Sequence, residues 1–458
     1  LGPFGLMNLT GPPIALHSTD YLAEQLETPR YVGSENLREM VKAGNQWEIG
    51  ENTDCSEEAA EIIRVRLLGQ VFAVAGQIVD EEICSLEDVD RGAKVGLRWA
   101  RGPFELANRL GIDEAKAMAE DYSELANFPV PEIWKRDEAF QFSYVDLETK
   151  DGIATITINR PEAMNALNET VVNQLGDALD KANSDDSVRT IVLDGAGKAF
   201  VAGADVKFFV DKIRADSFPD IYDFTAHGHT VQDKLESSSK TTIALTTGLA
   251  LGGGLELALA CDYRIGTRKT QFRFPETSIG IFPGLGGTQR PARIAGIPAA
   301  RWAVLAGNFM DSNTAADLGL VTHLVDISDV DSTITSIDNE GKPANKYPAQ
   351  PAKPDSKVAM FAQSFYSNEN LETILSGNCP DGFDMEDRNV SRQMKSLSRV
   401  APIALRMASD LIDAADNTNL VDGLSKELEN LEMIFSTSDA LEGLSALIEG
   451  RKPTYQNL

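Results

Sequence analysis

The sequence has few residues that commonly bind metals or form disulfides. Among 458 residues there are four cysteines and four histidines. The cysteines form no CxxC pair, so they indicate neither a disulfide scaffold nor a zinc site, and we expect a reducing, cytoplasmic environment. His227 and His229 lie close together, but no Cys or acidic residues complete a zinc-binding spacing. No metal site is therefore expected.

Long apolar runs and an excess of positive charge are also missing. No stretch of about 18 apolar residues predicts a membrane span. The 42 basic and 70 acidic residues give a formal net charge of −28, which repels nucleic acid and anionic lipid. A nucleic-acid partner is not expected, and an anionic ligand would depend on local positive groups or backbone N–H donors. The chain begins with Leu1 and no leader peptide follows, so we expect the start of a longer product to be missing.

An internal repeat marks the first third of the chain. GPFGLMNLTG at 2–11 returns as GPFELANRLG at 102–111, with six of ten positions identical. Each copy predicts a turn, one aromatic anchor and a short helix that ends at glycine. Between the copies, residues 57–80 carry apolar residues at helical spacing and predict a long, largely buried helix. We therefore expect an all-helical domain at 1–127.

This helical region resembles the C-terminal domain of 3-hydroxyacyl-CoA dehydrogenases from residue 1 to about 125. In that family two related helical units pack together, and here the first unit looks truncated. No GxGxxG motif follows a predicted strand in 1–150, so NAD binding is not expected in this chain. We interpret the region as a packing and oligomerisation module without chemistry of its own.

A change of pattern follows a proline-marked linker at 128–141 and predicts an α/β domain at 142–458 with a C-terminal helical tail. A Pro-, Lys- and Asn-rich segment at 327–357 predicts an exposed loop. Alternating apolar residues predict the strands and amphipathic spacing predicts the helices. The expected strands are 142–147, 153–159, 191–193 and 242–246, and the expected helices are 171–182, 404–415 and 420–435.

Three glycine-rich segments adjoin strand-like sequence at 198–209, 248–262 and 272–290. Glycine lets backbone N–H groups approach a ligand closely, and a helix that begins after the Gly252–Gly254 run would add its positive end. Any one of these segments alone would more often be an ordinary packing turn. Their order and spacing, together with NRPEAMNALN at 159–168, resemble the crotonase superfamily across the whole α/β domain. The resemblance implies a ClpP/crotonase-like α/β spiral of ββα units.

The same resemblance assigns roles to five residues. Backbone N–H groups of Ala204 and Gly253 would form an oxyanion hole for a thioester carbonyl. Glu256 and Glu276 match the two glutamates of enoyl-CoA hydratases, which hold a water between them as general base and general acid. Gly284 matches a position whose backbone orients the second acid and the water. The two neighbouring histidines fall in what we interpret as a variable, non-catalytic loop.

The resemblance also implies a site for coenzyme A. Glu162 and Gly450 stand where hydratases often carry basic residues, so the contacts to the 3′-phosphate would fall to Arg160, Arg451 or Lys452. The residues that match the family's CoA pocket are Ala163, Met164, Ala166, Ala202, Asp205, Val206 and Lys207.

The leading interpretation is hydration of a trans-2-enoyl-CoA to a 3-hydroxyacyl-CoA, in fatty-acid or related acyl-CoA metabolism, without a metal or organic cofactor. Other crotonase chemistries are the alternatives: an enoyl-CoA isomerase typically needs only one of the two acids, and decarboxylases or hydrolases usually replace one. The presence of both favours a hydratase. The chain could be the hydratase half of a bifunctional dehydrogenase/hydratase. A different class of function is a structural subunit of a β-oxidation complex. Family likeness implies a homotrimer or a multiple of trimers.

Overall fold

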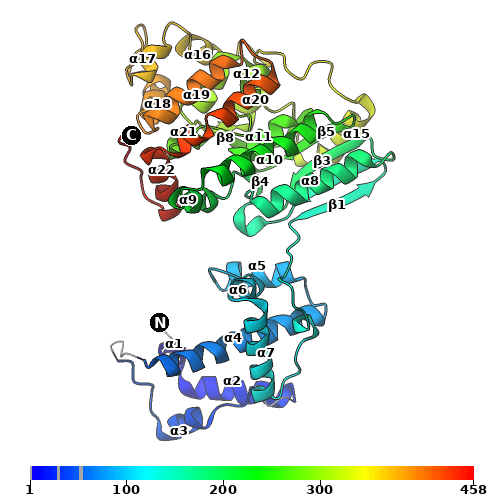
Figure 1. The fold of residues 1–458 in the computed structure, drawn as a ribbon, viewed down its shortest axis with the longest axis vertical. Helices are drawn as coiled ribbons and strands as arrows, with labels where there is room; N and C mark the ends of the chain where they lie inside the picture. The colour runs from blue at the N-terminus through cyan, green and yellow to red at the C-terminus, as the bar shows by residue number, and fades with distance from the viewer. Residues whose placement is uncertain (1–2, 28–30, 51–54, 458) are drawn as a thin grey trace. The chain divides into compact units, whose positions relative to one another are not determined.

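The computed structural model describes residues 3–27, 31–50 and 55–457, and the chain divides into two compact units, Leu1–Phe142 and Ser143–Leu458 (Figure 1). The described residues of the first unit form helices, as expected, and the second unit is α/β. The helices of the first unit are α1 (Pro3–Thr10), α2 (Pro12–Gln25), α3 (Glu35–Ala43), α4 (Glu57–Asp80), α5 (Leu86–Gly96), α6 (Pro103–Leu110) and α7 (Ile112–Ala126).

Helix α4 has the predicted bounds but not the predicted burial. The Ser56 side chain accepts a hydrogen bond from the Ala59 N–H and caps its first turn. Within this helix five residues are buried, whereas Ile62 and Leu67 are exposed. The expectation of a largely buried helix is therefore wrong, because apolar residues surround the helix while α7 covers one side of it. A Cβ at Gly69 would lie 2.2 Å from the Met118 carbonyl of α7.

By length and composition α4 could also cross a membrane, with a mean hydropathy of 1.5. The sequence predicted no membrane span, because no uninterrupted apolar run of about 18 residues is present. A helix that packs within a protein passes the same test, and α4 packs along α7 with 28% of the apolar window buried.

The sequence repeat is also a structural repeat. The Asn8 side chain exchanges two hydrogen bonds with the backbone of Trp47, at 2.7 and 2.8 Å. Asn108, 100 residues later, makes the same pair with the backbone of Phe140, at 2.9 and 2.8 Å. Each copy therefore fixes an aromatic residue that follows it in the chain.

The segment expected as a linker packs into the helical unit. It contains a short 3₁₀ helix, η2 (Glu132–Trp134), and both Trp134 and Phe140 are buried. The Trp134 indole N–H donates to the Phe72 carbonyl at 3.0 Å. The aromatic residues beside the prolines thus complete the core of the first unit rather than bridging two units.

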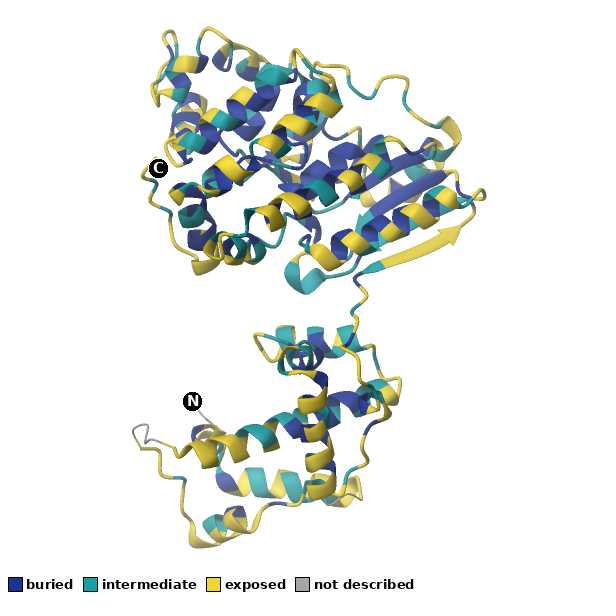
Figure 2. Ribbon diagram, in the orientation of Figure 1, coloured by how far each residue is buried: buried dark blue, intermediate teal, exposed yellow. Residues whose placement is uncertain are grey.

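The second unit contains two sheets. The larger sheet has, in spatial order, β1 (Val145–Lys150), β2 (Ile153–Ile158), β3 (Thr190–Gly195), β5 (Thr241–Thr246), β7 (Tyr263–Gly266) and β10 (His323–Leu324). The smaller sheet has β4 (Ala199–Ala202), β6 (Leu249–Leu251), β8 (Gln271–Arg273) and β9 (Met310–Asp311). Figure 2 shows that β3 and β5 are buried, whereas the edge strand β1 is exposed.

Helices follow and cover these strands. They are α8 (Glu169–Ser184), α9 (Val206–Arg214), α10 (Phe218–Glu236), α11 (Gly253–Ala260), α12 (Arg290–Ala295), α13 (Ile297–Val304), α14 (Ser312–Leu318), α15 (Val330–Glu340), α16 (Lys357–Phe365), α17 (Leu371–Leu375), α18 (Arg388–Leu397), α19 (Pro402–Ala414), α20 (Leu420–Glu429), α21 (Leu431–Phe435) and α22 (Ser438–Glu449). Three 3₁₀ turns are η3 (Pro161–Ala163), η4 (Glu276–Ile279) and η5 (Ile327–Asp329).

From β3 to β8 consecutive strands alternate between the two sheets, which confirms the expected spiral of ββα units. Strands β3, β5 and β7 enter the larger sheet, and each is followed by β4, β6 or β8 in the smaller sheet. Strands β4, β6 and β8 are parallel neighbours. Because the carboxyl ends of parallel neighbours lie at the same edge, the three glycine-rich segments that follow them meet there.

The segment predicted as one exposed loop at 327–357 instead begins with the turn η5 and helix α15. Val330, Ile334 and Ile337 recur at helical spacing and pack against buried residues of the larger sheet. Further along, Lys346 is largely buried and donates to the Ala260 carbonyl at 2.6 Å. These contacts could not be predicted from the sequence, because prolines and charged residues are typical of exposed loops.

Candidate active site

The three glycine-rich segments line a cavity of about 300 Å³. All five residues that the resemblance assigned to catalysis lie on its wall: Ala204, Gly253, Glu256, Glu276 and Gly284. They come from the loop after β4, from α11, from η4 and from the loop after η4. A volume of this size suits a small acyl group.

Two backbone N–H groups on this wall remain available. The bridge between Leu167 and Ala204 uses the Gly203 carbonyl and the Asp205 N–H, so the Ala204 N–H points away from Leu167. Gly253 is the first residue of α11, where a helix has no internal acceptor for the N–H. Within the described part of the chain neither N–H donates a backbone hydrogen bond. The arrangement suits an oxygen that gains negative charge.

Glu256 is held by two backbone donors. Its carboxylate is buried, and its Oε1 accepts from the Leu285 N–H at 2.8 Å and from the Gly287 N–H at 2.7 Å. A Cβ at Gly287 would lie 2.7 Å from the same oxygen. The two donors are the backbone neighbours of Gly284, which itself contributes to the cavity wall. Its expected role concerns the second acid and the water, and this role stays a prediction.

Glu276 presents an unsatisfied oxygen. The residue is 7% exposed, and its Oε2 has no hydrogen-bond partner among the described residues. Its Oε1 faces Gly252, where φ is 47° and a Cβ would lie 2.3 Å from that oxygen. Glycine is therefore required there for both backbone conformation and space. A buried polar atom without a partner is suited to bind water or substrate.

Burial raises the pKa values of both glutamates above those of ordinary carboxyl groups. It raises the pKa of Glu256 to about 7, against the stabilising N–H groups of Leu285 and Gly287. The pKa of Glu276 is raised well above its usual value, first by burial and then by the charge of Glu256. Because like charges repel, the pair favours one carboxylate and one carboxylic acid at neutral pH. Glu256, with two N–H donors, is the better carboxylate.

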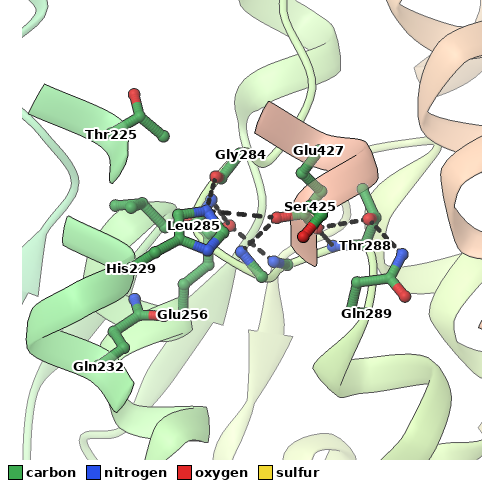
Figure 3. Close-up of polar contacts among 12 residues, drawn as sticks. Thr225, His229, Gln232, Glu256, Gly284, Leu285, Thr288, Gln289, Ser425 and Glu427 are labelled. Atoms are coloured by element: carbon green, nitrogen blue, oxygen red, sulfur yellow. Dashed lines mark hydrogen bonds and ion pairs between the residues drawn. The ribbon is translucent and has the colours of Figure 1, made fainter. Parts of the chain in front are cut away.

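A third buried carboxyl, Glu427 of α20, shares the segment that holds Glu256 (Figure 3). It accepts from the Gly286 N–H at 2.7 Å, from the Thr288 N–H at 3.1 Å and from the Thr288 hydroxyl. Successive N–H groups of residues 285–288 therefore donate alternately to Glu256 and Glu427. Sequence analysis missed Glu427, because one glutamate in an amphipathic helix carries no signal of burial.

His229 joins this network from α10, a helix where sequence analysis placed a variable loop. Its Nε2 lies 2.7 Å from the Gly284 carbonyl and 3.8 Å from the Glu427 carboxylate (Figure 3). Burial lowers the pKa of His229 to about 4, so the ring is neutral at pH 7 and can donate to Gly284. His227 lines a different cavity.

The predicted CoA residues divide into two groups. Met164, Ala202 and Val206 line the cavity, and the Ala202 N–H donates to the Met164 carbonyl at 3.0 Å. The others occupy adjoining turns: Ala163 ends η3, Ala166 follows it, Asp205 caps α9, and Lys207 is an exposed residue of that helix.

Two of the basic residues predicted to contact the CoA 3′-phosphate already have other partners in the structure. Arg160 donates to the Ala166 carbonyl at 3.3 Å and lies 3.6 Å from Asp205. Arg451 forms ion pairs with Glu442 and Glu449 at 2.6 and 2.5 Å. A phosphate at Arg451 would therefore have to displace two carboxylates.

Comparison with known proteins shows that the two parts of the chain are similar to two different families. Residues 153–457 match the family described as enoyl-CoA hydratase/isomerase, and residues 63–147 match the 3-hydroxyacyl-CoA dehydrogenase C-terminal domain. A probable enoyl-CoA hydratase of Mycobacterium bovis is 30% identical over 309 residues, covering 68% of this chain and 96% of that protein. A short-chain-enoyl-CoA hydratase of Clostridium acetobutylicum is 35% identical over 313 residues, covering 68% and 97%.

The fold is shared with a solved enoyl-CoA hydratase from Rhodobacter sphaeroides, with a TM-score of 0.59 and 23% identity, over 69% of this chain and 92% of that one. The chain belongs to the enoyl-CoA hydratase/isomerase family. The match to the dehydrogenase C-terminal domain, expected for residues 1 to about 125, covers residues 63–147, so the first copy of the repeat lies outside it.

Proposed function

We propose that the chain is an enoyl-CoA hydratase that adds water to a trans-2-enoyl-CoA. One observation carries the proposal: Glu256 and Glu276 are both buried on the wall of one cavity, beside the two available N–H groups of Ala204 and Gly253. The names of the relatives in Mycobacterium bovis and Clostridium acetobutylicum support the same activity.

In this mechanism the thioester oxygen accepts hydrogen bonds from the Ala204 and Gly253 N–H groups. Glu256, as the carboxylate, removes a proton from water while the water oxygen forms a bond to C3. Negative charge then develops on the thioester oxygen. The two N–H groups stabilise this charge, so they lower the energy of the transition state more than that of the ground state. Glu276, as the acid, then gives its proton to C2. After the reaction Glu256 carries the proton taken from water and Glu276 is ionised, and proton exchange with solvent restores both.

Substitution of each acid tests this mechanism. Glu256→Gln and Glu276→Gln should each lower crotonyl-CoA hydration by about 10²–10⁴-fold and leave thioester binding intact. The double variant should be little worse than the worse single one, because the two groups act as a unit. A single variant that hydrates within a few-fold of the parent would exclude the two-glutamate mechanism.

Isomerisation of a 3-enoyl-CoA is the competing activity within the family. It needs proton transfer between C2 and C4, for which one of the two acids suffices. Near-normal isomerisation after loss of one glutamate, with no hydration in the parent chain, would favour the isomerase. The enoyl thioester absorbance measures both reactions side by side, and a purely structural subunit would change it in neither.

The helical unit is proposed to act in assembly rather than in chemistry, without NAD, within a homotrimer or a multiple of trimers. The exposed apolar side chains of α4, among them Ile62, Ile63 and Leu67, support a packing role. Light scattering of the purified chain gives the number of subunits. Saturable NADH binding would contradict the structural role.

A further inference from the structure

A second cavity, of about 510 Å³, lies beside the active-site cavity and shares Arg273 with it. Four cationic side chains line it: Arg273, Lys357, Arg392 and Arg399. No carboxylate is part of its lining. In a chain with 70 acidic and 42 basic residues, such a segregation of charge requires an explanation.

One of these cations, Arg273, lies close enough to Glu276 for the two charges to interact. Among the described residues none of the four forms an ion pair, although the nearby Arg406 pairs with Glu372 at 2.7 Å and Lys353 pairs with Asp317 at 2.8 Å. Like charges that converge on one cavity repel each other, and a bound anion offsets this repulsion. The cavity therefore has the electrostatics of an anion site.

Helix α18 builds the basic wall from one face. Asn389, Arg392, Gln393 and Ser396 follow the i, i+3, i+4 and i+7 spacing that places side chains on a single side. Gln393 is buried: it donates to the Tyr366 hydroxyl at 2.6 Å and accepts from the Asn308 amide at 3.1 Å. These two hydrogen bonds fix the wall against the residue that follows α16 and against the segment after α13.

The remaining lining is aromatic and amide-bearing. Trp302, Phe309 and Phe361 contribute rings, and the Arg273 guanidinium lies 4.8 Å from the centre of the Phe309 ring. Guanidinium groups match phosphate geometry through paired N–H donors, and aromatic faces accept planar bases. Amides such as that of Asn389 can hydrogen-bond a base edge.

We propose that this cavity binds a phosphate-bearing nucleotide. Two sources share this chemistry, a free adenine nucleotide and the nucleotide portion of a CoA thioester. Lys357, Arg392 and Arg399 do not line the active-site cavity, so the proton transfers of hydration do not involve them, whereas Arg273 lines both cavities.

Calorimetry of the full chain with ADP and with pyrophosphate tests the proposal. The double variant Arg392→Gln/Arg399→Gln should weaken ADP binding by at least about tenfold. Arg388→Gln, on the same helix but outside the cavity lining, should bind ADP like the parent. Circular dichroism shows whether both variants are folded. Crotonyl-CoA hydration should be unchanged in Arg388→Gln, and in the double variant it should be unchanged if the ligand is a free nucleotide and show a raised KM if the ligand is the nucleotide portion of CoA.

The outcomes separate clearly. ADP binding that is lost in the double variant supports the site, and displacement of that ADP by acetyl-CoA then identifies CoA as its source. ADP binding that survives the double variant belongs to another site and overturns the proposal. So does the absence of saturable ADP and pyrophosphate binding at millimolar concentration. Loss of hydration in the parent chain would affect the proposed function and leave this inference standing.

Discussion

Replacing Glu427 by leucine should weaken both folding and hydration. The leucine side chain is of similar size but accepts no hydrogen bond, so the Gly286 and Thr288 N–H groups would remain buried without partners. Each such group costs about 1–3 kcal/mol, so the free energy of unfolding should fall by about 2–6 kcal/mol. Glu427→Gln should cost far less, because burial raises the pKa of Glu427 to about 8 and the native carboxyl is already largely neutral at pH 7.

Hydration should follow the same order, because residues 285–288 also hold Glu256. A displacement of about 1 Å at a catalytic group costs on the order of 100-fold in rate. We therefore expect kcat to fall about 100-fold in Glu427→Leu, with little change in KM, and to recover in Glu427→Gln.

Urea unfolding followed by circular dichroism, and crotonyl-CoA hydration at pH 7, measure the two effects. Glu429→Leu is the matched control, since Glu429 is an exposed residue of the same helix. The reasoning is refuted if Glu427→Leu unfolds and hydrates like this control. A Glu427→Gln variant as slow as Glu427→Leu would refute the positioning role, because the amide preserves the acceptor.

Three further predictions concern the same site. The pH profile of kcat should be bell-shaped. The rate falls below about pH 7, where Glu256 gains a proton, and again at high pH, where Glu276 loses one. A flat profile from about pH 5 to about pH 9 would contradict this assignment. Gly252→Ala should lower hydration by at least about tenfold, because its Cβ would meet Glu276, whereas Gly450→Ala, also at positive φ but in open space, should not. The fragment 143–458 should hydrate crotonyl-CoA like the full chain; a folded but inactive fragment would give the helical unit a role in the site.

The order of elements that builds the cavity could be predicted from the sequence because glycine leaves a local signal. The run at Gly252–Gly254 marks the start of α11, and the turn at Asp151-Gly152 adopts positive φ at both residues. Strand alternation located β2 and β5 to within one residue. These features depend on neighbours in the chain, so a single sequence contains them.

Features that depend on distant partners were not predictable in this way. Glu427 accepts hydrogen bonds from residues about 140 positions earlier in the chain, and nothing near it distinguishes it from the exposed Glu429. The burial of Trp134 depends on Phe72 and Phe104, which come from separate helices. The C-terminal stretch 420–435 was read as one helix, but it divides at Asn430 into α20 and α21.

The negative charge of the chain gives the active-site donors a physical rationale. A net charge of −28 opposes both an anionic ligand and an enolate oxygen. Backbone N–H groups at Ala204, Gly253 and residues 285–288 supply fixed positive dipoles that need no neutralising counter-charge. The same donors let Glu256 remain ionised while Glu276, which lacks them, keeps its proton. Each glutamate also has one arginine whose charge lowers its pKa, Arg290 for Glu256 and Arg273 for Glu276, so the two N–H donors of Leu285 and Gly287 make the difference between the acids. This is why the alignment of one short segment should control the rate.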